Sequence, residues 1–385
     1  IHAWFENGND RWIAAGSYNA LYVYNVGGTQ FNITPTSLTS GAEDATQSAG
    51  FGSSFYGNEA YGIERQVLSA VVPATTWALQ SWGENLIACS SSDGKIYEWQ
   101  LNTGTPAAPV TNAPVGCRSA VVTEERFLMA LGADSNPRLV KWSDREDNTQ
   151  WTPLATNEAG SLELQTEGVI MAGAKVQNQT LILTSIDAHV ATYSGPPYVY
   201  GIERIGSSCG IVSNKALAVV DSGAVWMGLR SFYTYTGGSV SELDCEVADH
   251  VFSNINVSQI SKVYSVPNAS FGEIWWFYPS SSSNENDSYV VFNYNDNTWA
   301  IGVIDRTAGV DAGVFRLPLL VSGTDNKIYE HEVGFSYDGA EPFAESGPIS
   351  IGNGDNVMSV TQMIPDEKTQ GDVDATFKTR FYPND

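Results

Sequence analysis

The sequence contains few basic residues, few histidines and no closely spaced cysteines. Among its 385 residues, 19 Lys and Arg face 43 Asp and Glu, which gives a formal net charge of −24. An acidic excess of this size argues against a protein that grips nucleic acid through its phosphates, but it permits a surface past which DNA slides. Cys89, Cys117, Cys209 and Cys245 lie far apart, without a C-x-x-C pair or a histidine at metal-ligand spacing. We interpret them as mostly buried free thiols.

Long apolar runs and catalytic motifs are also missing. No apolar run approaches the roughly 18 residues of a membrane span, so we expect no membrane insertion. Nucleophilic catalysis needs a Ser or Cys with a histidine base, and only His2, His189, His250 and His331 are available. The chain has no G-x-S-x-G, Walker loop or H-E-x-x-H. We therefore predict no catalytic residue, no cofactor and no metal ligand, and a protein that is not an enzyme.

Glycine and aromatic residues are abundant, and one heptapeptide occurs twice. The composition includes 36 Gly, 18 Tyr and 11 Trp, which is typical of a chain rich in strands and turns. D-G-K-I-Y-E-W at 93–99 returns as D-N-K-I-Y-E-H at 325–331. Asp-Gly and Asp-Asn tolerate the positive φ of tight turns, so both copies predict a β-hairpin. A hairpin that recurs so far along the chain indicates a repeat architecture.

The same theme recurs seven times as a short apolar strand, a polar turn and a strand with alternate aromatics. The copies begin near residues 11, 85, 126, 180, 223, 273 and 318. Most of these starts are about 40 to 50 residues apart, which is the blade period of a β-propeller with four-stranded blades. We predict an all-β protein with a propeller at 1–340. Seven repeat copies are compatible with six or seven blades, because the last copy can complete the first blade or form its own.

A long insertion interrupts the first repeat, from about 26 to 76. Its centre alternates aromatics with glycines and is too glycine-rich to build a core. Exposed aromatics on such a backbone suit docking against a neighbouring subunit, and the candidates are Phe51, Phe55, Tyr56 and Tyr61. The alternative is a long loop folded onto its own propeller.

The pattern changes after Gly334. Residues 348–352, 357–364 and 372–381 are interpreted as three longer strands, and the last alternates Val373, Ala375 and Phe377 with polar residues. We predict a small C-terminal antiparallel β-sheet domain at 341–385. Because the chain stops directly after a strand, we expect this domain to be incomplete.

Several segments in fixed order resemble tail proteins of short-tailed bacteriophages. They are 142–144, 151–153, 156–160, 209–210, 226–228, 232–238, 273–279 and 329–334, together with the glycine- and aromatic-rich insertion. The resemblance spans nearly the whole chain and is carried by the order of the motifs. It identifies the family as tail nozzle or tail hub proteins, also called DNA-stabilisation proteins. The chain ends sooner than is usual in that family.

This resemblance implies a virion structural protein located in the tail. Such subunits form a homo-oligomeric ring, typically a hexamer, below the portal and adaptor. The ring lines the channel through which the genomic DNA passes without specific binding, and it carries fibres or spikes outside. We expect part of the acidic charge to face this channel, since a cationic lumen would hold the DNA instead. The alternative is that the acidity serves solubility alone.

Two other function classes stay open from the sequence. A carbohydrate-cleaving tail protein needs a pair of carboxylates that converge from separate strands, and sequence spacing does not reveal such pairs. The acidic clusters at 144–147 and 284–287 lie in polar loops and are interpreted as solvated. A carbohydrate-binding protein would present aromatic-lined surface sites without cleaving its ligand.

Overall fold

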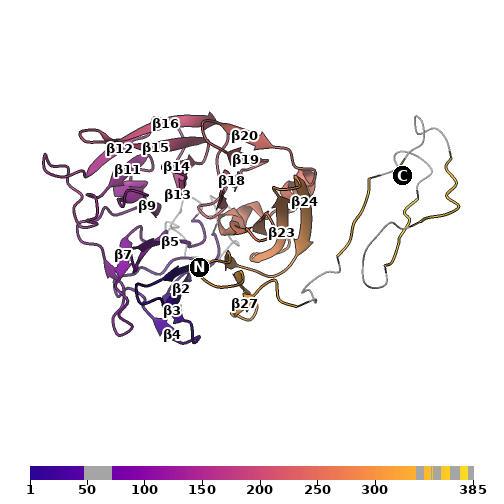
Figure 1. Ribbon diagram of the computed structural model, residues 1–385, viewed down its shortest axis with the longest axis horizontal. Helices are drawn as coiled ribbons and strands as arrows, with labels where there is room; N and C mark the ends of the chain where they lie inside the picture. The colour runs from indigo at the N-terminus through magenta and orange to yellow at the C-terminus, as the bar shows by residue number, and fades with distance from the viewer. Residues whose placement is uncertain (47–71, 335–341, 348, 350–356, 365–372, 380–385) are drawn as a thin grey trace, which may run out of the picture. The chain divides into compact units, whose positions relative to one another are not determined.

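The first part of the chain is a seven-bladed β-propeller. The computed structural model describes residues 1–46, 72–334, 342–347, 349, 357–364 and 373–379. The chain divides into two compact units, Ile1–Ala340 and Glu341–Asp385. In the first unit, seven antiparallel sheets stand around a common axis (Figure 1). The prediction of an all-β propeller is confirmed.

Each of the first six blades has four strands, and each strand pairs with the next along the chain. Figure 1 places β5, β9 and β13 near the axis and β4, β12 and β16 at the rim. Blades 1 to 3 contain β1 (His2–Phe5), β2 (Arg11–Gly16), β3 (Leu21–Asn25), β4 (Gln30–Asn32), β5 (Trp77–Trp82), β6 (Asn85–Ser90), β7 (Ile96–Trp99), β8 (Ala108–Pro109), β9 (Ser119–Val122), β10 (Leu128–Leu131), β11 (Leu139–Trp142) and β12 (Gly160–Glu163).

The remaining blades follow the same order, and the last has three strands in the described part of the chain. Blades 4 to 7 contain β13 (Ile170–Val176), β14 (Gln179–Thr184), β15 (Asp187–Gly195), β16 (Val199–Ser207), β17 (Leu217–Val220), β18 (Gly223–Met227), β19 (Phe232–Tyr235), β20 (Val240–Leu243), β21 (Tyr264–Asn268), β22 (Glu273–Pro279), β23 (Asn286–Asn293), β24 (Thr298–Val303), β25 (Ala308–Val310), β26 (Leu319–Val321) and β27 (Ile328–Glu330).

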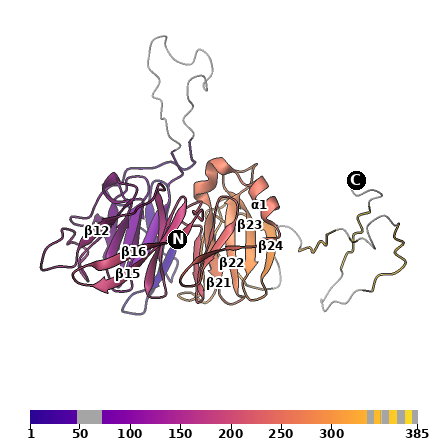
Figure 2. The same cartoon turned by 90° about the horizontal axis from the view of Figure 1, so that it is seen from above.

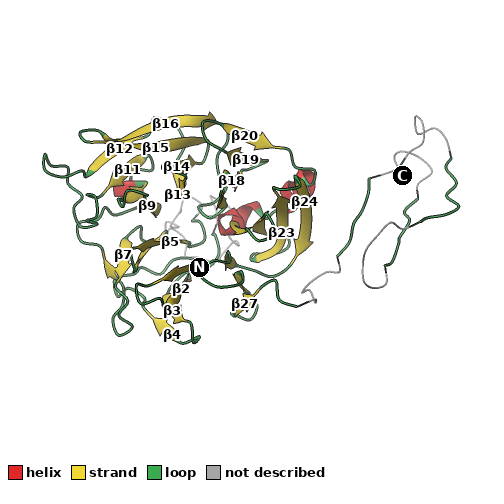
Figure 3. Cartoon of the chain, in the orientation of Figure 1, coloured by secondary structure: helices red, strands yellow, loops and turns green. Residues whose placement is uncertain are grey.

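Among the described residues, helices are confined to connections (Figure 3). They are the 3₁₀ helix η1 (Ala133–Ser135), the α-helix α1 (Ala248–Asn254) and the 3₁₀ helix η2 (Val257–Lys262). Within the described residues, no helix has both the length and the apolar character that a membrane crossing requires.

All seven predicted hairpins form, and each belongs to a separate blade. β1 pairs with β2, with Trp4 opposite Trp12, so the first repeat supplies its own innermost strand. The last hairpin, β26–β27, pairs inward with β25. The question of six or seven blades is therefore decided in favour of seven, because the last copy does not complete the first blade.

Period-two patterning gives each blade two buried faces. In β2, Trp12 and Ala14 pack toward blade 2, whereas Ile13 between them packs toward blade 7. All three side chains are buried. Alternate residues of a strand point to opposite faces of its sheet, and a propeller covers both faces with neighbouring blades. The apolar alternation in the sequence therefore builds the interfaces between blades.

The propeller has two distinct ends (Figure 2). In an antiparallel sheet, successive turns lie at alternate ends. The turns between second and third strands and the connections between blades share one end, which we call the insertion end because the insertion belongs to it. The turns between first and second strands and between third and fourth strands form the opposite end.

The repeated heptapeptide forms the same turn in blades 2 and 7. Gly94 and Asn326 have φ of 62° and 57°, as the Asp-Gly and Asp-Asn pairs predict. The connection is longer than a two-residue turn, because β6 ends at Ser90 and β7 begins at Ile96. The Asp93 carboxylate accepts the N–H of Lys95 at 3.1 Å, the hydroxyl of Tyr97 at 2.5 Å and the N–H of Thr39 at 3.4 Å.

Asp325 makes the equivalent bonds in blade 7, to the N–H of Lys327 at 3.2 Å and the hydroxyl of Tyr329 at 2.5 Å. The hydroxyl bond is the main reason that the pKa of the Asp325 carboxyl is lowered to about 2. Because the folded pKa is depressed, this contribution to stability is present above the unfolded pKa of 3.8 and is lost as pH falls toward 2.

We expect Tyr329→Phe to raise the pKa of Asp325 from about 2 toward 3.8. The phenylalanine keeps the ring but removes the hydroxyl that donates to the carboxylate. The measurement is an NMR pH titration of the Asp325 carboxyl carbon in both proteins. An unchanged titration would mean that the backbone donor of Lys327, and not Tyr329, controls this carboxyl.

The C-terminal unit differs from the prediction of a three-stranded sheet. Its described residues, 342–347, 349, 357–364 and 373–379, contain no strand, so the strand predicted at 357–364 is wrong. Val357 and Ile364 are 92% and 79% exposed, and Phe377 is 63% exposed. A strand needs a paired backbone and a covered apolar face, and alternation alone supplies neither. The exposed side chains show that this unit has no core of its own among the described residues.

Candidate interface at the insertion end

The insertion is shorter at its start than the sequence indicated. Residues 26–32 belong to the turn and fourth strand of blade 1, so the connection to blade 2 runs from 33 to 76. The docking candidates Phe51, Phe55, Tyr56 and Tyr61 lie outside the described residues. The two ends of the insertion are described, and their contacts define the site below.

The two ends pair with each other as short antiparallel arms. The N–H of Thr46 donates to the carbonyl of Val72 at 3.0 Å, and the reverse bond measures 3.1 Å. The N–H of Thr75 donates to the carbonyl of Ala42 at 2.9 Å. We call residues 41–46 and 72–76 together the insertion base. Paired arms give this segment a defined backbone at the point where it leaves the propeller.

The insertion base starts from blades 1 and 2. The N–H of Gly41 donates to the carbonyl of Tyr18, in the β2–β3 turn, at 2.8 Å. A Cβ at Gly41 would lie 1.8 Å from the Thr75 hydroxyl oxygen and 2.8 Å from the Cβ of Ser92 in blade 2. Only glycine allows both contacts. The arms are therefore pressed against each other and against blade 2.

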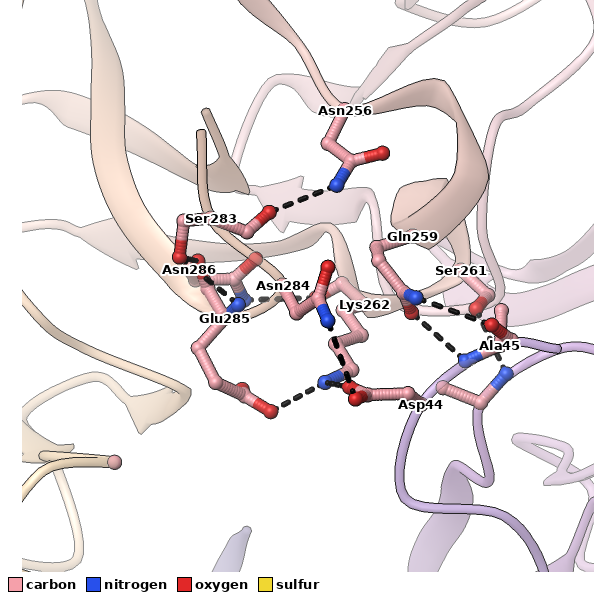
Figure 4. A network of polar contacts seen from close by, with 12 residues as sticks. Asp44, Ala45, Asn256, Gln259, Ser261, Lys262, Ser283, Asn284, Glu285 and Asn286 are labelled. Atoms are coloured by element: carbon pink, nitrogen blue, oxygen red, sulfur yellow. Dashed lines mark hydrogen bonds and ion pairs between the residues drawn. The ribbon is translucent and has the colours of Figure 1, made fainter. Parts of the chain in front are cut away.

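Gln259 of η2 holds the far side of the base. Its side-chain oxygen accepts the N–H of Ala45 at 2.8 Å, and its side-chain nitrogen donates to the carbonyl of Ala45 at 3.1 Å (Figure 4). The side chain thus imitates the two bonds of a neighbouring strand. Gln259 is only 4% exposed, so neither bond is readily replaced by water.

Ion pairs and further hydrogen bonds surround this amide contact. Lys262 donates to a carboxylate oxygen of Asp44 at 2.7 Å and also bonds the Glu285 carboxylate. The Lys262 side chain is 10% exposed, whereas both carboxylates are about half exposed. Ser261 accepts the N–H of Ala74 through its hydroxyl at 3.1 Å. The ammonium is thus buried with two compensating charges, as buried charges require.

A last contact joins the second arm to the connection between blades 4 and 5. The side-chain nitrogen of Asn214 donates to the Thr76 hydroxyl at 2.8 Å. The insertion base therefore reaches from blades 1 and 2 to blade 6 and to the connections on either side of blade 5. The arrangement fixes a segment in place and contains no nucleophile–base pair.

This contact is not predictable from the sequence. Gln259, Ser261 and Lys262 lie in a polar connection whose composition is ordinary, and their partners are more than 180 residues away. A polar side chain in a loop has no periodicity from which a partner can be read. The length of the insertion marks this part of the chain as unusual, but it does not indicate which residues hold its ends.

His189 and His331 make contacts that are compatible with structural roles, whereas Nε2 of His2 lies 2.8 Å from the hydroxyl of Ser81. His189 and Asp187 are buried, and Asp187 also accepts the hydroxyls of Thr166 at 2.7 Å and Thr184 at 2.5 Å. Nε2 of His331 accepts a bond from the Arg306 guanidinium at 2.8 Å. The Asp187 carboxylate is thus occupied by donors, and the His331 ring serves as an acceptor. Neither pair forms a base beside a free nucleophile.

Two surface cavities provide the other candidate sites. The first, about 470 Å³, lies between blades 4 and 5 and is lined by the amides of Gln177, Asn178 and Gln179, with Glu203 and Tyr235. The second, about 430 Å³, is lined by Glu167, the occupied Asp187 and Arg204, among others. Glu203 is the one carboxylate of the first cavity, so that cavity lacks the paired acid and base of a glycosidase.

The described part of the chain contains no group of three or more His, Cys, Asp or Glu that could hold a metal ion.

All four cysteines are free thiols. Cys89, Cys117 and Cys209 are buried and Cys245 is partly buried, so the interpretation from the sequence is confirmed. Burial raises the pKa of the Cys209 and Cys245 thiols to about 11, which keeps them protonated at neutral pH.

Comparison with known proteins assigns no family to this chain. No family model and no curated protein matches the sequence. A streptogramin B lyase structure shares 10% identity, with a TM-score of 0.47, over 85% of this chain and 88% of the other. Virginiamycin B lyase from Staphylococcus aureus shares 11% identity, with a TM-score of 0.42, over 83% and 90%. A protein from Lactobacillus plantarum shares 10% identity, with a TM-score of 0.47, over 84% and 95%. These likenesses say nothing about the activity of this chain, and the propeller is shown by its own seven sheets.

Proposed function

We propose that this protein is a structural subunit of a phage tail nozzle or hub ring, and not an enzyme. The ordered motifs that resemble this family support the proposal, as do the rigid propeller and the firmly held insertion base. In this role the chain assembles with copies of itself, contacts a portal or adaptor above and fibres or spikes below, and surrounds the exit path of the genomic DNA.

The observation that carries the proposal is the difference in charge between the two ends of the propeller. The turns of the opposite end hold many acidic residues, none of them buried: Glu6, Asp10, Glu84, Glu124, Glu125, Asp144, Glu146, Asp147, Glu158, Asp221, Asp296 and Asp311. The basic residues of the same described turns are Arg126, Arg145 and Arg316. This end therefore carries a net negative charge.

The insertion end is mixed in charge. Basic residues there include Lys95, Arg118, Arg138, Lys215, Arg230, Lys262, Arg306 and Lys327, among acidic neighbours. In the proposed ring, the acidic opposite end faces the DNA channel and the insertion end faces neighbouring subunits. An acidic wall repels phosphates and releases no counterions on contact, so the duplex slides without being held.

The test is electron microscopy of the particle that carries this chain. We expect a ring coaxial with the capsid below the portal, with the turns at Glu124, Asp144 and Asp296 directed at the lumen. A neutral or basic inner wall, with the acidic turns on the outside, would contradict the role of the acidic end in the channel. The acidic residues would then serve solubility alone. Absence of the chain from the tail axis would overturn the proposal as a whole.

A second candidate function is favoured by the cavity between blades 4 and 5. Its free amides at Gln177 and Asn178 and the Glu203 carboxylate suit the hydroxyl groups of a saccharide. With one carboxylate, the cavity supports binding and not cleavage. A glycan array separates the two candidates, since saccharide binding that depends on Glu203 would favour an adhesin over a nozzle subunit.

A further inference from the structure

The propeller ring has one boundary that the chain does not bridge. Every blade is connected to the next through the backbone, except that blade 7 and blade 1 meet only through space. We call this boundary the seam. Its buried core consists of Ala3, Ile13 and Leu319. The strands of blades 7 and 1 form no hydrogen bond with each other among the described residues, and they share no strand.

Since blades 7 and 1 share no strand, a contact that spans this boundary would help to hold the ring closed, and the insertion base lies where it can do so. It leaves blades 1 and 2 on one side of the seam and is bonded to η2, next to blade 6, on the other side. Blades 6, 7 and 1 together with the insertion base therefore form a closed circuit that contains the seam. We infer that the insertion base is a brace that holds the propeller closed at its seam.

Breaking the hydrogen bonds of the brace costs free energy, because they are shielded from water. Gln259 is buried, and its loss would leave both the N–H and the carbonyl of Ala45 without their partners. Ala45 is itself partly buried, and a polar group that loses its partner where water has little access forfeits more free energy than the bond itself contributes. Ala45 follows blade 1 in the chain and is bonded to Gln259 on the other side of the seam. If these bonds stay intact, blade 1 can move away from blade 7 only by rotating about this attachment.

The bonds also fix the position of the brace regardless of its side chains. Gln259 and Ser261 both bond to backbone groups, at Ala45 and Ala74, one on each arm. Because the arms pair with each other at Thr46 and Val72, neither arm can be displaced alone. The Asp44–Lys262–Glu285 ion pairs add a third attachment on the same side.

The experiment is hydrogen–deuterium exchange on the full chain carrying Gln259→Ala. If the base braces the ring, amides of β1 and β26 exchange about ten-fold faster than in the unaltered protein, because seam opening no longer breaks these bonds. Gln165→Ala is the matched control, since Gln165 is an exposed glutamine in an inter-blade connection at the same end. The control should leave β1 and β26 unchanged.

Faster exchange confined to residues 42–46 and 72–76, with β1 and β26 unaffected, would overturn the inference and leave the base as a local attachment. If Gln259→Ala does not fold, Ser261→Ala removes a single bond of the same brace and is expected to produce a smaller rise in the same two strands. The measurement uses the isolated chain, so its outcome is independent of whether the protein forms a tail ring.

Discussion

Leu319→Ala is expected to lower the free energy of unfolding by about 2 to 4 kcal/mol and to open the propeller at one place. Leu319 is 4% exposed and is the one buried residue that blade 7 contributes to the seam core. Truncation leaves a cavity next to Ile13 and Ala3. Blades 7 and 1 have no strand pairing with each other that could compensate for the lost apolar contact. Blades 7 and 1 should therefore separate before the rest of the ring unfolds.

The neighbouring leucine supplies the control. Leu320 lies on the same strand with 6% exposure, but it packs on the other face, against Tyr264 and Phe277 of blade 6. Leu320→Ala removes the same atoms at a boundary that the chain bridges. Urea denaturation measures both losses, and hydrogen exchange locates them.

We expect similar losses of stability but different maps of exchange. Leu319→Ala should expose β1 and β2 to exchange, whereas Leu320→Ala should affect β21 and β26 and leave β1 protected. Identical exchange maps for the two variants would show that the seam is no weaker than a bridged boundary.

Combining Leu319→Ala with Gln259→Ala should lower the free energy of unfolding by more than the sum of the two single losses, since the seam and the brace close the same circuit.

The hairpins were predictable because two local signals agree at each of them. Alternation such as Trp12-Ile13-Ala14 is set by the pleat of a strand, and residues such as Gly94 and Asn326 supply the positive φ that the turn needs. Both signals act within a few residues. The number of blades depends on whether the terminal strands share a sheet, which is a contact between distant residues, so local pattern left six and seven open.

The brace and the C-terminal unit show what a local pattern does not determine. Gln259 is indistinguishable in sequence from an exposed loop residue such as Gln165, and only the folded ring brings Ala45 beside it. The reverse holds at Val373 and Phe377, which alternate as a strand would and yet form none in the described residues. Periodicity states which face of a strand would be buried, but a strand forms only when something covers that face.

The repeated heptapeptide allows one interaction to be compared at two depths of burial. Tyr97 is fully buried, and its hydroxyl donates to Asp93, whose side chain is 4% exposed. Tyr329 donates to Asp325 with the same geometry, but that carboxylate is 31% exposed. Water can replace a lost donor at Asp325 but not at Asp93.

Tyr97→Phe is therefore expected to cost about 1.5 to 3 kcal/mol of unfolding free energy, because the buried carboxylate of Asp93 loses its strongest donor. The Lys95 ammonium, 3.8 Å away, offsets only part of this loss. Tyr329→Phe should cost clearly less than Tyr97→Phe, since the carboxylate of Asp325 is hydrated. Both variants keep the aromatic ring, so packing is unchanged and urea denaturation measures the hydroxyl alone. Equal losses in the two blades would mean that burial does not govern the strength of this bond, and that the two turns depend instead on the backbone donors of Lys95 and Lys327.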